Sequence, residues 1–218
     1  MPVFLLIRHG ENDFVGKRLA GHLPGVHLNE KGRQQAALIA QSLSKAPIKA
    51  IYSSPLERAV ETAAPLAQAL NLPVNIRPGL IEIDFGRWQG KTGKQMRRLK
   101  LWKVVQDNPS QMRFPDGESF VEAQQRLYQE IDAIKGLHEE HDLVACFSHS
   151  DAISLLVTHY LGLPLDNFQR LSVGTASMSV LFLGKEGHPH LGPIGQAFEI
   201  NFESRDPKGE KRKRRVTG

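Results

Sequence analysis

Three short apolar runs, each followed by a segment with helical periodicity, constrain the fold of this chain most strongly. The runs lie at residues 3–7, 48–53 and 143–148. Nearly continuous apolar runs of this length are typical of parallel strands that helices cover on both faces. Two later runs, at residues 178–183 and 197–202, indicate further strands. The pattern therefore predicts an α/β fold with a largely parallel sheet.

Helix-end signals lie in the connections between these runs. Asn29 is a suitable N-cap for a helix over residues 30–43, whose small and apolar residues share one face. Ser54 and Pro55 have the N-cap and first-turn chemistry of a second helix, which Pro65 should break or kink.

Two more helices are indicated in the second half of the chain. Ser119 and Glu122 have the spacing of a capping box, and an apolar stripe continues from them toward Leu137. The helix that follows the third apolar run should stop at Gly162, a residue suited to a C-terminal cap.

The chain of 218 residues is long enough for one domain with its own core, and no repeat or linker divides it. We therefore expect a single domain over residues 1–204. Residues 205–218, "RDPKGEKRKRRVTG", supply much of the formal net charge of +5 and have almost nothing apolar to bury. This composition predicts a disordered basic tail, whose contact with nucleic acid would be nonspecific because no recognised binding motif accompanies it.

Composition also bears on location and redox chemistry. No apolar stretch approaches the roughly 18 residues of a membrane span, and the chain starts directly with a strand-like run, so we expect no membrane association and a cytoplasmic protein. Cys146 is the only cysteine and lies inside an apolar run, which indicates a packed thiol and excludes an intramolecular disulfide.

Unusual polar residues follow the first three apolar runs. Arg8 and His9 end the first, Arg58 lies in or near the first helical turn after the second, and His149 ends the third. Ligands of open α/β sheets gather at the carboxyl ends of the strands. Two arginines and two histidines in one cleft would repel one another without an anion, and a guanidinium fork matches phosphate oxygens. We expect a pocket for a phosphoryl group that needs no metal ion.

Four motifs in this order, "LIRHGEN", "SSPLERAVETA", "EIDFGRWQG" and "FSHSDAI", make the chain resemble the histidine phosphatase superfamily, also called the phosphoglycerate mutase-like family. The resemblance covers roughly residues 3–183. It implies a three-layer sandwich with a mostly parallel central sheet flanked by helices. It also implies a phosphatase without cofactor or metal, closer to the phosphatase branch than to the mutases.

The resemblance assigns a role to each motif residue. His9 would attack phosphorus and become phosphohistidine, while Arg8, Arg58 and a protonated His149 would stabilise the phosphoryl oxygens. Glu82 would protonate the leaving oxygen and then activate water, helped by apolar neighbours that favour its protonated form. The competing acid, less favoured by its motif position, is Asp84. The implied substrate-binding residues are Arg8, Asn12, Gly21, Arg58, His149 and Ser150.

The chain departs from the family motifs at three places. Asn12 stands where threonine is usual, Ser150 where glycine is common, and Gln89 where glutamate is common. A side chain at Ser150 would narrow the pocket or bond the phosphate. Cofactor-dependent phosphoglycerate mutases have an asparagine where Val15 stands, and a longer connection from the acid to the second histidine, which favours a phosphatase here.

Several alternatives stay open. A phosphoglycerate-type mutase is the first, and a pseudoenzyme that binds phosphorylated ligands is less favoured because His9 and Glu82 are both retained. The cations of residues 91–115, expected to form a lid or wall, either attract an acidic substrate or form a solvated helix face. The histidines of "HPH", residues 188–190, indicate a turn rather than metal ligands. Substrate identity and oligomeric state are not predicted.

Overall fold

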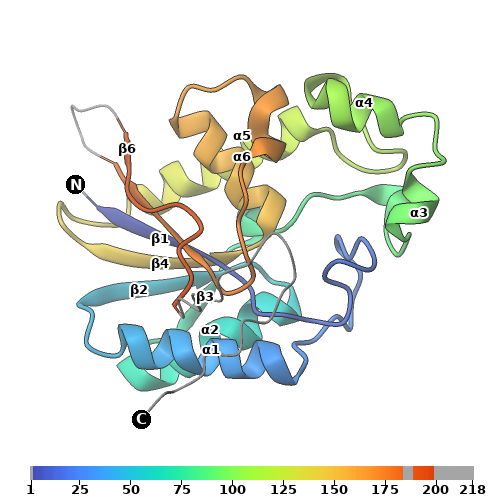
Figure 1. Ribbon diagram of the computed structural model, residues 1–218. Helices are drawn as coiled ribbons and strands as arrows, with labels where there is room; N and C mark the ends of the chain where they lie inside the picture. Colours follow the sequence, from blue (N-terminus) through green and yellow to red (C-terminus); the bar gives the residue numbers. More distant parts are fainter. Residues whose placement is uncertain (1, 184–188, 199–218) are drawn as a thin grey trace, which may run out of the picture.

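The fold is seen in a computed structural model that describes residues 2–183 and 189–198 (Figure 1). Within these residues, six strands form one sheet in the order β3-β2-β4-β1-β5-β6. Their bounds are β1 (Val3–Arg8), β2 (Ile48–Ser53), β3 (Val74–Ile76), β4 (Leu143–Ser148), β5 (Met178–Phe182) and β6 (His190–Leu191). The first four strands are parallel, and β5 and β6 are antiparallel to their neighbours. The predicted α/β fold with a mostly parallel sheet is confirmed.

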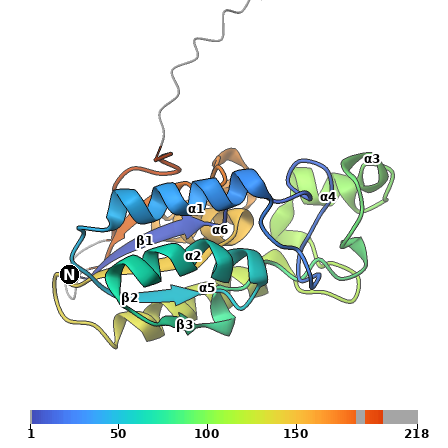
Figure 2. The same ribbon diagram turned by 90° about the horizontal axis from the view of Figure 1, so that it is seen from below.

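Alternation along β1 explains why the sheet needs a helical layer on each side. Phe4 and Leu6 pack into a core with α5 (Phe120–Lys135) and α6 (Ser150–Tyr160). Leu5 and Ile7 point to the opposite face, where they pack with α1 (Glu30–Leu43) and α2 (Glu57–Leu70). Figures 1 and 2 show these two helix pairs on opposite sides of the sheet, which confirms the three-layer sandwich.

Two of the helix caps predicted from the sequence are confirmed. Asn29 Oδ1 accepts a hydrogen bond from Gly32 N at 2.9 Å. Ser119 and Glu122 form the predicted capping box at the start of α5. These caps are local signals, so they are readable without knowledge of the tertiary structure.

The prediction for α2 is wrong in two respects. The helix begins at Glu57, with Leu56 rather than Ser54 at the N-cap, and it continues across Pro65, so of the predicted break or kink the break is wrong. Proline removes one helical hydrogen bond. Burial of neighbours such as Leu66 against the sheet outweighs that loss.

The carboxyl ends of β1 and β2 point toward the same end of the molecule, and Figure 2 shows α3 (Gly93–Met96) and α4 (Trp102–Asp107) beyond that end. Short 3-10 turns connect this region: Pro78–Leu80, Gly86–Trp88, Pro109–Gln111 and Leu165–Arg170. The polar residues that end the strands therefore face a wall built from the middle of the chain.

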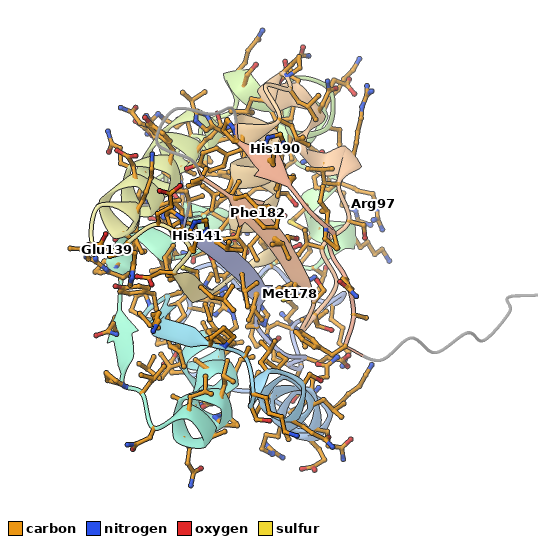
Figure 3. All side chains as sticks on the ribbon, turned by 90° about the vertical axis from the view of Figure 1, so that its left-hand side faces the viewer. Arg97, Glu139, His141, Met178, Phe182 and His190 are labelled. Carbon is orange, nitrogen blue, oxygen red and sulfur yellow. The ribbon has the colours of Figure 1, made fainter. Side chains whose placement is uncertain are left out.

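The other edge of the sheet is a hairpin of β5 and β6, on which Figure 3 labels Met178, Phe182 and His190. His190, in β6, pairs with Phe182 of β5, so the turn predicted at His190 is wrong. His188 lies outside the described residues. Most of the apolar run at 197–202 and the basic tail also lie outside them. No helix in the described ranges is long and apolar enough to span a membrane.

Cys146 is fully buried in β4. Burial raises the pKa of its thiol, which disfavours the thiolate form that a nucleophile requires. The prediction of a packed thiol is confirmed.

Candidate active site

A cavity of about 240 Å³ opens at the carboxyl end of β1, and we call it the strand-end cavity. Its walls come from the segment after β1, the first turn of α2, the acid motif and the start of α6. Most of the predicted site residues line it: Arg8, His9, Asn12, Gly21, Arg58, Glu82 and Ser150. Asp151, Arg18 and Val15 line it as well.

The hydrogen bonding of His9 leaves one of its ring nitrogens, Nε2, with a free lone pair. Its Nδ1 lies 2.7 Å from Gly10 O, and because a carbonyl only accepts, Nδ1 carries the proton and donates it. Burial, with further contributions from Arg58 and Arg8, lowers the pKa of His9 well below its ordinary value. The imidazole is therefore neutral near pH 7, with an unprotonated Nε2.

Arg58, in the first turn of α2, is only 1% exposed. Its Nη2 donates to Gly21 O at 2.8 Å, while Nε and Nη1 are buried without a hydrogen-bond partner in the described part of the chain. Arg8 is similar, because its Nη1 donates to Val173 O at 2.6 Å and its buried Nε has no such partner. Burial lowers the pKa of both guanidinium groups, yet arginine stays charged at any ordinary pH.

Asn12, like the two arginines, has a buried side-chain nitrogen without a partner among the described residues. Its Oδ1 accepts from the backbone N–H groups of Phe14 and Val15, at 2.9 and 3.2 Å. This fixes the orientation of the amide and leaves Nδ2 buried and unpartnered among the described residues. The polar side chain at this departure from the family motif thus adds a donor.

His149 is completely buried, and it is not among the residues that line the strand-end cavity. Its Nε2 lies 2.7 Å from Ser54 Oγ, and its Nδ1 has no partner within the described ranges. Burial, followed by the charges of Arg58 and its neighbours, lowers the pKa of His149 well below its ordinary value. This direction favours a neutral His149, while the protonated His149 expected beside a phosphoryl group stays a prediction.

Five buried nitrogens of this site lack partners among the residues that the structure describes. They are Arg8 Nε, Asn12 Nδ2, Arg58 Nε, Arg58 Nη1 and His149 Nδ1. Buried polar groups are nearly always hydrogen-bonded, so such a concentration indicates a site prepared for a ligand rich in acceptors. A tetrahedral oxyanion has that character.

Glu82 is a carboxyl group of the cavity whose acidity is strongly altered. Its Oε1 accepts from the N–H groups of Ile83 and Ala152, at 3.1 and 3.3 Å. Burial, together with the nearby Asp151, raises the pKa of Glu82 to about 7. Asp84 does not line the cavity, and its Oδ1 accepts from Gly86 N at 2.9 Å instead.

Arg126 of α5 holds the segment that carries Glu82. Its guanidinium donates to the carbonyl oxygens of Gly79, Ile81 and Glu82, at 2.8, 3.0 and 3.3 Å. It also pairs with Glu118 at 2.7 Å. Because these bonds fix the backbone, the acid is positioned by a helix on the far side of its loop.

The contacts of Gln89 explain why glutamine can stand where the family motif commonly has glutamate. Its side-chain oxygen accepts from His22 N, and its Nε2 donates to Asp84 Oδ1 at 3.4 Å. An amide can do both, whereas a glutamate at this position would repel Asp84. Gly21 lies close by at φ +52°, where an added Cβ would clash with the side-chain oxygen of Gln89.

Ser150 lines the cavity as expected, but its hydroxyl is directed to Val173 O at 3.4 Å, the same carbonyl that binds Arg8. The wall formed by residues 91–115 is also present, although its cations do not line the cavity. Met96, Trp102 and Val105 face a neighbouring cavity instead, whereas Arg97, labelled in Figure 3, is exposed.

Besides Arg126, sequence reasoning missed several polar residues of the site. Thr62 Oγ1 accepts from Gly10 N at 2.9 Å and donates to Arg58 O at 2.6 Å, which ties the first and second motifs together. Ser54 contacts His149, and Arg18 and Asp151 line the cavity. Only Asp151 had a usable signal, since an acid two residues after a strand-end histidine, in the first turn of the next helix, lies near any anion bound there.

The geometry can be compared with known proteins. The family model described as the histidine phosphatase superfamily (branch 1) matches residues 4–191. The chain belongs to the histidine phosphatase superfamily. The predicted family is thus confirmed over nearly all of the described residues.

Relatives within the superfamily include both phosphatases and mutases. Phosphoserine phosphatase 1 of Hydrogenobacter thermophilus is 30% identical over 188 residues, which cover 84% of this chain and 87% of the relative. A probable phosphoglycerate mutase, GpmB, of Erwinia tasmaniensis is 33% identical over 177 residues, covering 80% and 81%. The mycobacterial glucosyl-3-phosphoglycerate phosphatase Rv2419c, solved with VO3, has a TM-score of 0.81 at 29% identity, covering 89% and 99%. The predicted enzyme class, a phosphoric monoester hydrolase, is confirmed by the family and these phosphatases.

Proposed function

We propose that the protein hydrolyses small phosphomonoesters through a phosphohistidine on His9, without a metal ion, with Glu82 as general acid and base. The observation that carries this proposal is a neutral imidazole with a free Nε2 beside five unpartnered buried nitrogens. A site that merely bound phosphate would need the nitrogen donors but neither the oriented lone pair nor the protonated carboxyl group.

In the first step His9 Nε2 attacks phosphorus, and the bond from phosphorus to the alcohol oxygen breaks. Arg8 and Arg58 neutralise charge on the nonbridging oxygens, and Asn12 Nδ2 adds a hydrogen bond. Glu82 gives its proton to the departing oxygen, a role suited to its pKa of about 7.

In the second step Glu82, now ionised, takes a proton from water as the water attacks the phosphohistidine. The bond from phosphorus to Nε2 breaks, inorganic phosphate leaves, and His9 and protonated Glu82 are restored. His149 acts in both steps as a neutral N–H donor from Nδ1, provided that Ser54 Oγ donates its proton to Nε2.

A phosphoglycerate-type mutase is the second candidate, because the probable mutase of Erwinia tasmaniensis is as similar to this chain as the phosphatases are. The two activities share the phosphohistidine and differ in the acceptor, which is water or a second substrate hydroxyl. Val15 lines the cavity where the mutase motif has an asparagine, which supports the phosphatase.

The test is phosphate release from a panel of phosphomonoesters, including phosphoserine and 3-phosphoglycerate, in the presence of EDTA. His9→Ala should abolish release, and His190→Ala, on the exposed strand β6, should leave it unchanged. Conversion of 3-phosphoglycerate to its isomer without phosphate release would favour the mutase. Release that EDTA stops would overturn the metal-free mechanism. A cytoplasmic location and the extent of the domain, residues 1–204, remain predictions.

A further inference from the structure

A second cavity of about 150 Å³ adjoins the strand-end cavity, and we call it the aromatic cavity. Three residues line both: Leu19, Phe85 and Asp151. The aromatic cavity therefore lies next to the place where the alcohol part of a phosphomonoester would leave the phosphate donors.

Aromatic rings dominate this second cavity. Trp88 and Trp102 line it with their rings nearly parallel, at a centroid separation of 6.4 Å and an angle of 24°, and Phe114 meets Trp88 edge to face. Trp88 and Phe114 are 4% and 2% exposed, so these walls are fixed by packing. Such a surface takes an apolar group, not a second phosphate.

Asp151 is the one acidic side chain shared by the two cavities. Within the described part of the chain, its carboxylate has no hydrogen-bond or salt-bridge partner. Burial raises the pKa of Asp151, while the charge of Arg8 lowers it. In its ionised form Asp151 only accepts hydrogen bonds, so in that form it adds nothing to the binding of ionised phosphate oxygens, which also only accept.

We propose that Asp151 is a specificity-determining residue, which selects phosphomonoesters whose leaving group carries an ammonium group near the ester oxygen and an apolar body seated in the aromatic cavity. This inference rests on the proposed function. An ammonium group would give Asp151 the donor that it lacks and would favour its ionised form. A carboxylate in the same place would meet a like charge, or would require Asp151 to take up a proton.

The experiment uses three matched substrates: benzyl phosphate, 2-(aminomethyl)benzyl phosphate and 2-carboxybenzyl phosphate. kcat/KM is measured for each with the wild type, Asp151→Asn and Asp107→Asn, the last being an exposed aspartate of α4 that lines neither cavity. Because Asp151 also affects Glu82, the quantity compared is the ratio of amine to carboxylate substrate within each variant. An effect transmitted through Glu82 also changes kcat/KM for benzyl phosphate, which carries neither charged group and therefore serves as the reference substrate for it.

We expect the wild type and Asp107→Asn to favour the amine over the carboxylate by about 10- to 100-fold, and Asp151→Asn to lose at least about tenfold of that preference. A ratio near one in the wild type, or one that Asp151→Asn leaves unchanged, would overturn the inference while His9-dependent hydrolysis of benzyl phosphate still upheld the proposed function. Absence of hydrolysis of all three substrates would overturn both.

A second measurement does not depend on the variant folding. The corresponding benzylphosphonates, which cannot be hydrolysed, are tested as competitive inhibitors of the wild type. The aminomethyl compound should bind most tightly and the carboxy compound most weakly. The reverse order would contradict the role of Asp151.

Discussion

The imidazole rings of His9 and His149 lie with their centroids 5.2 Å apart, and each has one nitrogen fixed by the protein. Gly10 O fixes Nδ1 of His9, and Ser54 Oγ contacts Nε2 of His149. The free nitrogens are thus of opposite kinds: Nε2 of His9 offers a lone pair, and Nδ1 of His149 is suited to donate. Two neutral histidines can in this way serve as nucleophile and oxyanion donor side by side.

Ser54 should therefore act as a positioning residue for His149. In the proposed mechanism the Ser54 hydroxyl donates to Nε2 of His149 and so favours the Nδ1–H tautomer. Ser54→Ala removes this hydroxyl, and we expect kcat/KM to fall by about tenfold, in proportion to one weakened hydrogen bond. Ser44→Ala, an exposed serine whose hydroxyl bonds Gln41 O, is the matched control. Nitrogen NMR shifts of His149 should move toward a mixture of tautomers in Ser54→Ala only. Unchanged shifts would rule out this role.

The acidity of Glu82 predicts the pH dependence of kcat/KM. Glu82 has a pKa of about 7 and acts in its protonated form, so activity should fall as pH rises through that value. The lowered pKa of His9 places the loss of the nucleophile by protonation well on the acid side of 6.5. Glu82→Gln should reduce hydrolysis of alkyl phosphates by about 10²- to 10⁴-fold and remove the alkaline limb.

Asp84→Asn is the control for this pH profile, since Asp84 lies near Glu82 in sequence but does not line the cavity. It should keep the alkaline limb. Loss of that limb in Asp84→Asn, with the limb retained in Glu82→Gln, would transfer the acid role to Asp84. The second ionisation of the substrate phosphate, near pH 6, is common to all variants and serves as an internal reference.

We expect Arg58 to lower the stability of the fold while it is required for hydrolysis. It is buried, and its Nε and Nη1 have no hydrogen-bond partner among the described residues, so the desolvation of this cation is only partly offset. Arg58→Met should raise the free energy of unfolding without ligand by about 1 to 4 kcal/mol and abolish hydrolysis. Phosphate should raise the Tm of the wild type but not of Arg58→Met. Arg97→Met, at an exposed position, should change neither, and a lower stability of Arg58→Met would show that the cation is already compensated.

The fold could be predicted because its signals are local or periodic. Asn29, Ser119 and Glu122 cap the helices as expected, and four of the five apolar runs, at residues 3–7, 48–53, 143–148 and 178–183, match strands. Pro65 was misjudged because the packing of α2 on the sheet is a tertiary effect that outweighs a local preference.

In the candidate site, too, local features could be predicted and features that depend on tertiary contacts could not. The motif residues of the first strand end carry their own signal, whereas Thr62 and Arg126 act through bonds to residues 52 and 44 to 47 positions away in the chain. The lowered pKa of His149 could not be predicted either, since it depends on complete burial beside Arg58. Such features follow from the assembled structure and not from any one segment.

The most direct test of the account is whether His9 becomes phosphorylated during turnover. Wild type mixed with a good substrate and quenched rapidly in alkali should carry an acid-labile phosphate, and digestion should place it on Nε2 of His9. With an aryl phosphate, whose leaving group needs no proton from Glu82, Glu82→Gln should accumulate more of this species, because water attack on the phosphohistidine needs the Glu82 carboxylate. Turnover without any phosphate on His9 in either protein, or an acid-stable phosphate elsewhere, would contradict the proposed mechanism.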